Sequence, residues 1–277
     1  APGRGGRPSA PLVLVDTHLL PAGDDEIPID LDHAHSDAVA AAVSRILVAH
    51  PGPFRCVRIT CCYMEEDRAR VERWLKLVAS KGVQELFLIN RPLPLTLDKH
   101  LPATFFSMTA LTRLYLSFWR FPDTAALPRH AAFPCLRELG LCSTFIDSGE
   151  LEFVLARSPV LEILNLQGTI KESIAVVNAP CLDRLILWEV RGYPNPASGL
   201  STRIKIGIAP KLRILGYLDP AQHQLEIGGT VIMVLLLPPV VPFCSLCNDV
   251  EFNVRSMLLN FVHCRLGLHQ PQPQYSQ

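Results

Sequence analysis

A leucine pattern that recurs along the chain restricts the possible fold more than any other feature. The spacing L-x-x-L-x-L starts at Leu111, Leu136 and Leu161, so that successive starts lie 25 residues apart. The same spacing starts again at Leu182, and weaker copies start at three further positions: Phe54, Val83 and Leu212. Because regular copies of one pattern indicate a repeated structural unit, the sequence predicts seven stacked repeats.

Each repeat predicts one short strand, since positions four and six of the pattern point to one side and the residues between them to the other. Apolar residues at helical spacing over 66–79 and 150–156 predict return segments behind the strands. Prolines precede five strand starts and end the return segments there: Pro53, Pro134, Pro159, Pro180 and Pro210. Neither element buries its apolar face alone, so the repeats must stack. We therefore expect an α/β leucine-rich-repeat solenoid, with parallel strands on the concave face and helices or irregular segments on the convex face.

Position nine of the repeats varies more than the leucines do. It holds Cys62, Thr144 and Thr169 in three repeats, but Trp119 and Val190 in two others. One ladder of polar side chains cannot satisfy all of these loops, and uneven curvature is expected.

The two ends of the array follow weaker patterns. Residues 12–15 predict a strand, and 37–49 predict a helix with Ser36 as its N-cap. Leu225 and Ile227 suggest one more edge strand, and 257–262 a short final helix. The Gln- and Pro-rich residues 270–277 are expected to be disordered.

Composition excludes several classes of partner. The chain has 26 Lys and Arg against 26 Asp and Glu, and no basic face is visible, so neither nucleic acid nor an anionic membrane is expected. The apolar run at 231–237 is too short to span a bilayer. Nine cysteines, an odd number, and no N-terminal apolar run after a basic region predict reduced thiols in an intracellular protein, cytoplasmic or nuclear.

Several phrases of the sequence carry a family resemblance. They lie at 44–53, 82–86, 111–116, 133–139 and 209–217. Together they resemble plant F-box/leucine-rich-repeat proteins of the kind that often ends in an FBD segment, and the resemblance covers about residues 9–232. It implies an F-box that docks on a Skp-type adaptor of a cullin ubiquitin ligase, and repeats that select the protein to be ubiquitinated.

The chain departs from that family pattern at both ends. The nine residues before Ala10 are too few and too rich in Gly and Pro for F-box helices, and 9–16 resembles the strand that follows an F-box. We expect 1–36 to be a remnant strand and acidic loop, 37–232 the repeat domain, and 233–277 an incomplete FBD-like segment. Such a chain recognises a target, and meets a Skp-type adaptor only if a longer form carries an F-box.

The concave face is the expected binding surface, built from repeat positions two, three and five. The proposed contacts are Arg58, Phe87, Arg113, Tyr115, Glu138, Asn165 and Trp188. Lateral pairing is expected among Glu85, Arg113 and Glu138, and also among Arg137, Glu162 and Asp183, either within a partner footprint or as charges that only neutralise one another. The aromatic group Phe87, Tyr115, Phe118 and Trp188 either exposes apolar area to a partner or packs against loops or a terminal segment.

Two clusters contain residue types that bind metal ions, but in neither cluster does the spacing along the chain match a known metal-binding motif. Cys244, Cys247, His263 and Cys264 are zinc-ligand types, but buried reduced thiols are the simpler interpretation. The Asp and His residues of 30–37 lead into a helix start, where acidic groups favour the helix dipole. No phosphate loop, G-x-S-x-G or H-E-x-x-H motif occurs, so no catalytic residue, metal or cofactor is assigned.

These observations predict a non-catalytic protein-binding module, most simply the substrate-recognition part of an SCF-type ubiquitin ligase subunit. A first alternative is a scaffold or decoy that binds a target without recruiting the ligase. A second alternative is a zinc-binding protein that uses the Cys244 to Cys264 cluster.

Overall fold

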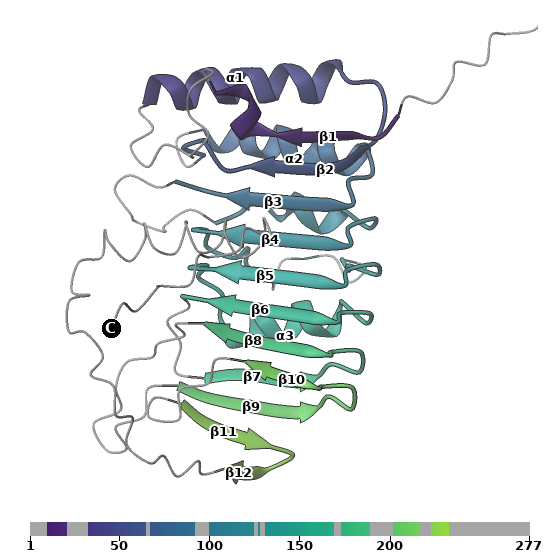
Figure 1. Ribbon diagram of the computed structural model, residues 1–277, viewed down its shortest axis with the longest axis vertical. Helices are drawn as coiled ribbons and strands as arrows, with labels where there is room; N and C mark the ends of the chain where they lie inside the picture. The colour runs from purple at the N-terminus through teal and green to yellow at the C-terminus, as the bar shows by residue number, and fades with distance from the viewer. Residues whose placement is uncertain are drawn as a thin grey trace, which may run out of the picture. The chain divides into compact units, whose positions relative to one another are not determined.

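The computed structural model describes residues 10–20, 33–64, 67–91, 100–124, 127, 131–168, 173–188, 202–216 and 223–232 (Figure 1). By its internal contacts the chain divides into two units, 1–235 and 236–277, and all described residues belong to the first. The boundaries of the repeat domain, expected after residues 36 and 232 from the sequence, remain a prediction.

The main element of the first unit is an eight-stranded, all-parallel sheet. Its strands, in spatial order, are β1 (Leu12–Val15), β2 (Phe54–Ile59), β3 (Glu85–Ile89), β4 (Arg113–Ser117), β5 (Glu138–Cys142), β6 (Ile163–Gln167), β8 (Arg184–Trp188) and β10 (Ile214–Gly216). Position four of each repeat lies beside position four of the next, as in the register of Leu114, Leu139 and Leu164. The predicted stack of seven repeat strands is confirmed, and β1 adds the expected strand at one edge.

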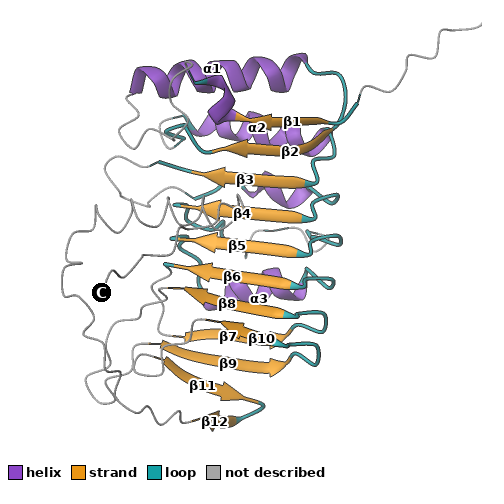
Figure 2. Ribbon diagram, viewed as in Figure 1, coloured by secondary structure: helices purple, strands orange, loops and turns teal. Residues whose placement is uncertain are grey.

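Helices lie between β1 and β2, between β2 and β3, and between β5 and β6 (Figure 2). They are α1 (His33–Ala49), α2 (Arg68–Ser80) and α3 (Ser148–Ala156), with 3-10 turns η1 (Asp16–Leu19) and η2 (Ala103–Ser107). Asp147 and Glu150 form a capping box at the start of α3, which explains why the helix begins there. No helix among the described residues has the length and apolar character needed to cross a membrane.

Ser36 is not the N-cap that the sequence predicts. The helix α1 begins three residues earlier, at His33, and Ser36 lies buried within it. Its hydroxyl oxygen accepts a hydrogen bond from the Tyr63 backbone N–H at 2.8 Å. Ser36 therefore ties the helix to the loop after β2, a tertiary contact that local capping rules do not contain.

The last return segments are strands, where helices or irregular segments were expected. They form a second sheet of β7 (Ser173–Asn178), β9 (Thr202–Ile208), β11 (His223–Ile227) and β12 (Thr230–Ile232), in the order β12-β11-β9-β7. The expected extra edge strand around Leu225 and Ile227 is β11, but it pairs with β9 in this second sheet and not with β10. Alternate burial in β7, as at Ile174 and Val176, is the period of a half-buried strand.

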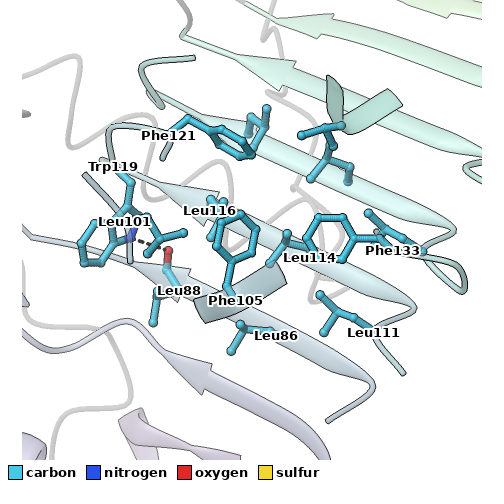
Figure 3. Close-up of a cluster of buried hydrophobic side chains, with 14 of the residues drawn as sticks. Leu86, Leu88, Leu101, Phe105, Leu111, Leu114, Leu116, Trp119, Phe121 and Phe133 are labelled. Carbon is cyan, nitrogen blue, oxygen red and sulfur yellow. Dashed lines mark hydrogen bonds between the residues drawn. The ribbon is translucent and has the colours of Figure 1, made fainter. Parts of the chain in front are cut away.

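Leucines at positions four and six point into one continuous core. Between β3 and β5 this core also contains the rings of Phe105, Phe121 and Phe133, which lie beside the leucines of β3 and β4 (Figure 3). The Phe105 and Phe133 ring centroids are 5.5 Å apart. Because aromatic rings fill more volume than leucine, they close the space left where the return segment is a short 3-10 turn.

Position nine makes one recurring loop contact in two repeats. The Trp119 indole N–H donates to the Leu88 carbonyl at 3.2 Å, drawn as a dashed line in Figure 3. The Thr144 hydroxyl donates to the Leu116 carbonyl at 3.1 Å, and both carbonyls are at position six of the preceding repeat. Trp119 therefore satisfies its loop as a polar residue would, contrary to the expectation from sequence. Thr169 and Val190 lie outside the described residues.

Candidate protein-binding face

The side chains at repeat positions two, three and five lie outside the core, and we call the surface that they form the front face. Two lateral rows cross it in register. Row three consists of Cys56, Glu85, Arg113, Glu138, Ile163, Arg184 and Ile214, and row five of Arg58, Phe87, Tyr115, Gly140, Asn165, Ile186 and Gly216. The fold thus brings six of the seven predicted contact residues to these two rows. Trp188 ends β8 beside Gln167, and its side chain lies outside the described residues.

Row five is a continuous stack at its first four positions. The Arg58 guanidinium lies 4.2 Å from the centroid of the Phe87 ring. The Phe87 and Tyr115 rings are stacked, with centroids 4.9 Å apart and 9° between their planes. At Gly140 a Cβ would lie 2.3 Å from the Tyr115 ring, so the ring occupies the space that a side chain would need.

Of the two alternatives left open for the aromatic group, exposure of apolar area does not hold for the three members whose side chains are described. Phe87 and Tyr115 are each 3% exposed and Phe118 is 2% exposed. For Phe87 and Tyr115 the physical reason is lateral packing, because the two rings of row five stack on each other and Gly140 leaves room for the Tyr115 ring. Their contribution to binding remains a prediction, and it can act only through the shape and rigidity of the face.

An ion-pair network in row three joins three strands. Arg113 lies between two carboxylates, 3.6 Å from Glu85 and 3.1 Å from Glu138. The Tyr115 hydroxyl donates a hydrogen bond to the other carboxylate oxygen of Glu138. The buried Glu138 carboxylate is thus paired through both oxygens, as a buried charge requires. The predicted lateral pairing of Glu85, Arg113 and Glu138 is confirmed.

A second set of pairs runs along position two. Arg137 pairs with Glu162 on the neighbouring repeat, as predicted. Asp183 does not join them, because it pairs with Arg213 of the next repeat and with Arg184 at 3.3 Å. The hydrogen bond from Arg213 is the main cause that lowers the pKa of Asp183. The spacing between strands lets Asp183 reach position two of either neighbouring repeat, Glu162 or Arg213. Asp183 pairs with Arg213 because the two side chains carry opposite charges.

Asn165 is half-buried in row five, and its side-chain Oδ1 is buried without a hydrogen-bond partner. Sequence patterning finds Asn165 by its position but has no means of predicting that its carbonyl oxygen lacks a donor. Ile186, its neighbour in the row, offers none.

Metal-ligating groups do not gather in the described part of the chain. There, no three His, Cys, Asp or Glu side chains are placed to hold one ion. Burial raises the pKa of Cys61 to about 12 and raises that of Cys62 as well, so both thiols stay protonated. The four proposed zinc ligands lie outside the described residues: Cys244, Cys247, His263 and Cys264. Two residues of the other cluster, Asp30 and Asp32, also lie outside them.

The solvent-facing residues that sequence reasoning missed are Arg184, Arg213 and the exposed Ile214. Their repeat positions were available as a signal, because all three occupy positions two or three of the last two repeats. The side chains of these three residues are exposed to solvent, whereas Phe87 and Tyr115 of row five are buried.

Comparison with known proteins agrees with this repeat architecture. The LRR repeats of FBD-associated F-box protein At5g56370 match residues 71–173 and 168–264. Two Arabidopsis thaliana proteins are similar: F-box/LRR-repeat protein At1g06630, 33% identical over 141 residues, and F-box protein At4g27050, 32% identical over 109 residues. These alignments cover 48% and 38% of this chain, and 33% and 22% of the two relatives. The chain thus spans about a third or less of the curated relatives it matches.

No solved structure matches the chain. The family match nevertheless runs through ten of the strands described above, from β3 to β12, and covers most of the chain. On this evidence the chain belongs to the LRR family of FBD-associated F-box proteins.

Proposed function

We propose that the front face is the target-recognition surface of an SCF-type ubiquitin ligase subunit, and that it acts without catalysis of its own. Family membership supports this proposal, because the matched repeats come from proteins named as F-box proteins. An F-box in a longer form would supply the contact with a Skp-type adaptor. The expected setting is intracellular.

The observation that carries the proposal is that the front face combines a packed stack in row five with exposed side chains in row three. Row five forms a rigid internal stack, whereas row three presents Arg113, Arg184 and Ile214 to solvent. A rigid scaffold with a mixed charged and apolar surface loses little conformational entropy when a partner docks. This arrangement suits selective protein binding.

Proximity labelling in plant cells tests the proposal. The chain is compared with a front-face variant, Arg137→Glu with Ile214→Asp, and with a control on the second sheet, Lys205→Glu with Val231→Asp. All four residues are at least partly exposed, so the folds should survive. We expect a set of labelled proteins to disappear with the front-face variant only. Equal labelling by all three forms would exclude this face.

The ubiquitination state of those labelled proteins distinguishes a ligase subunit from a decoy. If the protein selects targets for the ligase, its depletion lowers their ubiquitination. If it shields them, depletion raises their ubiquitination, and the ligase assignment is wrong.

A further inference from the structure

The arginines of the front face lie outside the carboxylates with which they pair. Arg113 exposes 45% of its side chain, whereas its partners Glu85 and Glu138 expose 18% and 7%. Asp183 exposes 19%, beneath Arg184 at 48% and Arg213 at 76%. Arg137 exposes 60% and its partner Glu162 exposes 45%. In each of these pairs the arginine side chain is the more exposed one, so an approaching molecule meets mainly cationic side chains although the chain has a formal net charge of zero.

We call the four residues Arg113, Arg137, Arg184 and Arg213 the arginine layer; they come from β4 and β8 and from the residues just before β5 and β10. A guanidinium carries five N–H donors in a planar fork. Among the described contacts, Arg184 donates only through Nε, to Asp183, and Arg137 only through one terminal nitrogen, to Glu162. Donors therefore remain for a second carboxylate on the solvent side of each.

We propose that the arginine layer binds an acidic, extended segment of a partner protein. This inference rests on the proposed function and adds the chemistry of the target. Carboxylates match the guanidinium fork, and the pairing needs no rearrangement of the carboxylates beneath. Charge complementarity of this kind selects partners and accelerates their association.

The geometry of row three sets the spacing of the acidic residues. Arg113 and Arg184 are separated by three strand spacings, or about 14 Å at ~4.8 Å each. An extended peptide advances about 3.4 Å per residue, so carboxylates about four residues apart would reach both. Ile163 lies between these arginines in the same row, and Ile214, 46% exposed, follows Arg184. The segment should therefore carry an apolar residue beside its acidic ones.

A nucleic acid fits this surface less well than a peptide does. A nucleic acid carries a negative charge on every nucleotide, about one per 3.4 Å of helix axis for each strand of a duplex, so its phosphates cannot avoid the carboxylates. Glu162 is nearly half exposed beside Arg137. A peptide, in contrast, can place uncharged residues over Glu162 and acidic residues over Arg113 and Arg184.

Fluorescence anisotropy with a labelled synthetic peptide tests the inference. The probe is a peptide of about eight residues, enough to cross four strand spacings, with two Glu residues four apart, one Ile between them and Ser elsewhere. Its counterparts replace both Glu residues with Gln or with Lys, and oligothymidylate is the fourth probe. We expect the Glu peptide to bind most tightly, and to weaken as salt is raised.

The protein variants make the test specific to the arginine layer. Arg184→Glu with Arg213→Glu should weaken binding of the Glu peptide at least tenfold. Arg203→Glu, an exposed residue of β9 that bonds Gln224, is the matched control and should leave binding unchanged. Circular dichroism and urea unfolding verify that both variants are folded.

Three results would overturn the inference: equal binding of the Gln peptide, no measurable binding of the Glu peptide, or tighter binding of oligothymidylate that depends on the same arginines. None of these affects the proposed function if labelling in cells still depends on Arg137 and Ile214. Loss of that dependence, with peptide binding intact, would instead remove the proposed function and keep an acidic-peptide site.

Discussion

Gly140 allows the Tyr115 ring to pack in row five, because a Cβ there would lie 2.3 Å from the ring. We predict that Gly140→Ala lowers the free energy of unfolding by about 1–3 kcal/mol, the usual cost of overpacking. The matched control is Gly216→Ala in the same row, where the nearest atom, Ile186 Cγ2, lies 3.9 Å from the added Cβ. Urea unfolding measures both, and near-equal losses would contradict the proposed crowding.

Asp16 is a buried carboxylate that joins the end of β1 to the end of β2. It accepts hydrogen bonds from the backbone N–H groups of Thr60 and Cys61, each at 2.6 Å, and from the Thr60 hydroxyl at 3.1 Å. Burial, the largest influence, raises the pKa of Asp16 above its ordinary value near 3.8, although these hydrogen bonds lower it. The folded state therefore binds this proton more tightly than the unfolded state does.

We predict that the contribution of Asp16 to stability is greatest below its ordinary pKa and declines as pH rises through the higher pKa of the folded state. Asp16→Asn removes this titration and keeps a carbonyl acceptor. The free energy of unfolding of the wild-type chain, minus that of the variant, should fall as pH rises above the ordinary pKa near 3.8. Urea unfolding at several pH values gives this difference, and a rise with pH would show that the hydrogen bonds outweigh burial.

Among the elements, the loops after the strands depend on position nine. Thr144 is buried and bonds the Leu116 carbonyl, whereas the partly exposed Thr112 bonds the Gln84 carbonyl, which also accepts two backbone N–H groups. We predict that Thr144→Val lowers the free energy of unfolding by about 1–3 kcal/mol, since a buried partner is lost. Thr112→Val should cost less than about 0.5 kcal/mol, because water and the backbone groups remain. Equal costs in thermal or urea unfolding would contradict a special role for position nine.

The second sheet shows how far local pattern predicts an element. Helices α2 and α3 were expected from helical spacing and are present, because their apolar residues recur every three or four positions. In β9 the buried residues Ile204 and Ile206 alternate with exposed or partly exposed ones, which is the period of a strand. This signal was in the sequence, but the repeat expectation assigned those residues to an irregular return.

For the first unit as a whole, stability should follow the stacking of repeats. Each inner repeat buries its leucines between two neighbours, and a terminal repeat has only one. Leu139 and Leu215 both occupy position four, but Leu139 is fully buried in the middle of the sheet and Leu215 is partly exposed at the edge strand β10.

We predict that Leu139→Ala lowers the free energy of unfolding by about 2–5 kcal/mol, through lost burial and the cavity left behind. Leu215→Ala should cost about 1 kcal/mol, because less apolar area leaves water there. Urea unfolding followed by circular dichroism measures both variants. Similar losses would mean that residues beyond β10 bury Leu215 as completely as the inner repeats bury Leu139.

The sequence by itself determined the repeat, the parallel order of its strands and the family. This is possible because the periodic leucines specify a local strand, and the inability of each repeat to bury them alone forces stacking. Lateral charge pairs such as Glu85 with Arg113 followed from the same register.

Only the tertiary structure decided which front-face side chains meet solvent. The burial of Phe87 and Tyr115 depends on contacts across four strands, from Arg58 to Gly140, and the choice of Arg213 as the partner of Asp183 depends on the next repeat. Exposure is a property of neighbours in space, and residues 23 to 30 positions apart along the chain become neighbours only after the repeats stack.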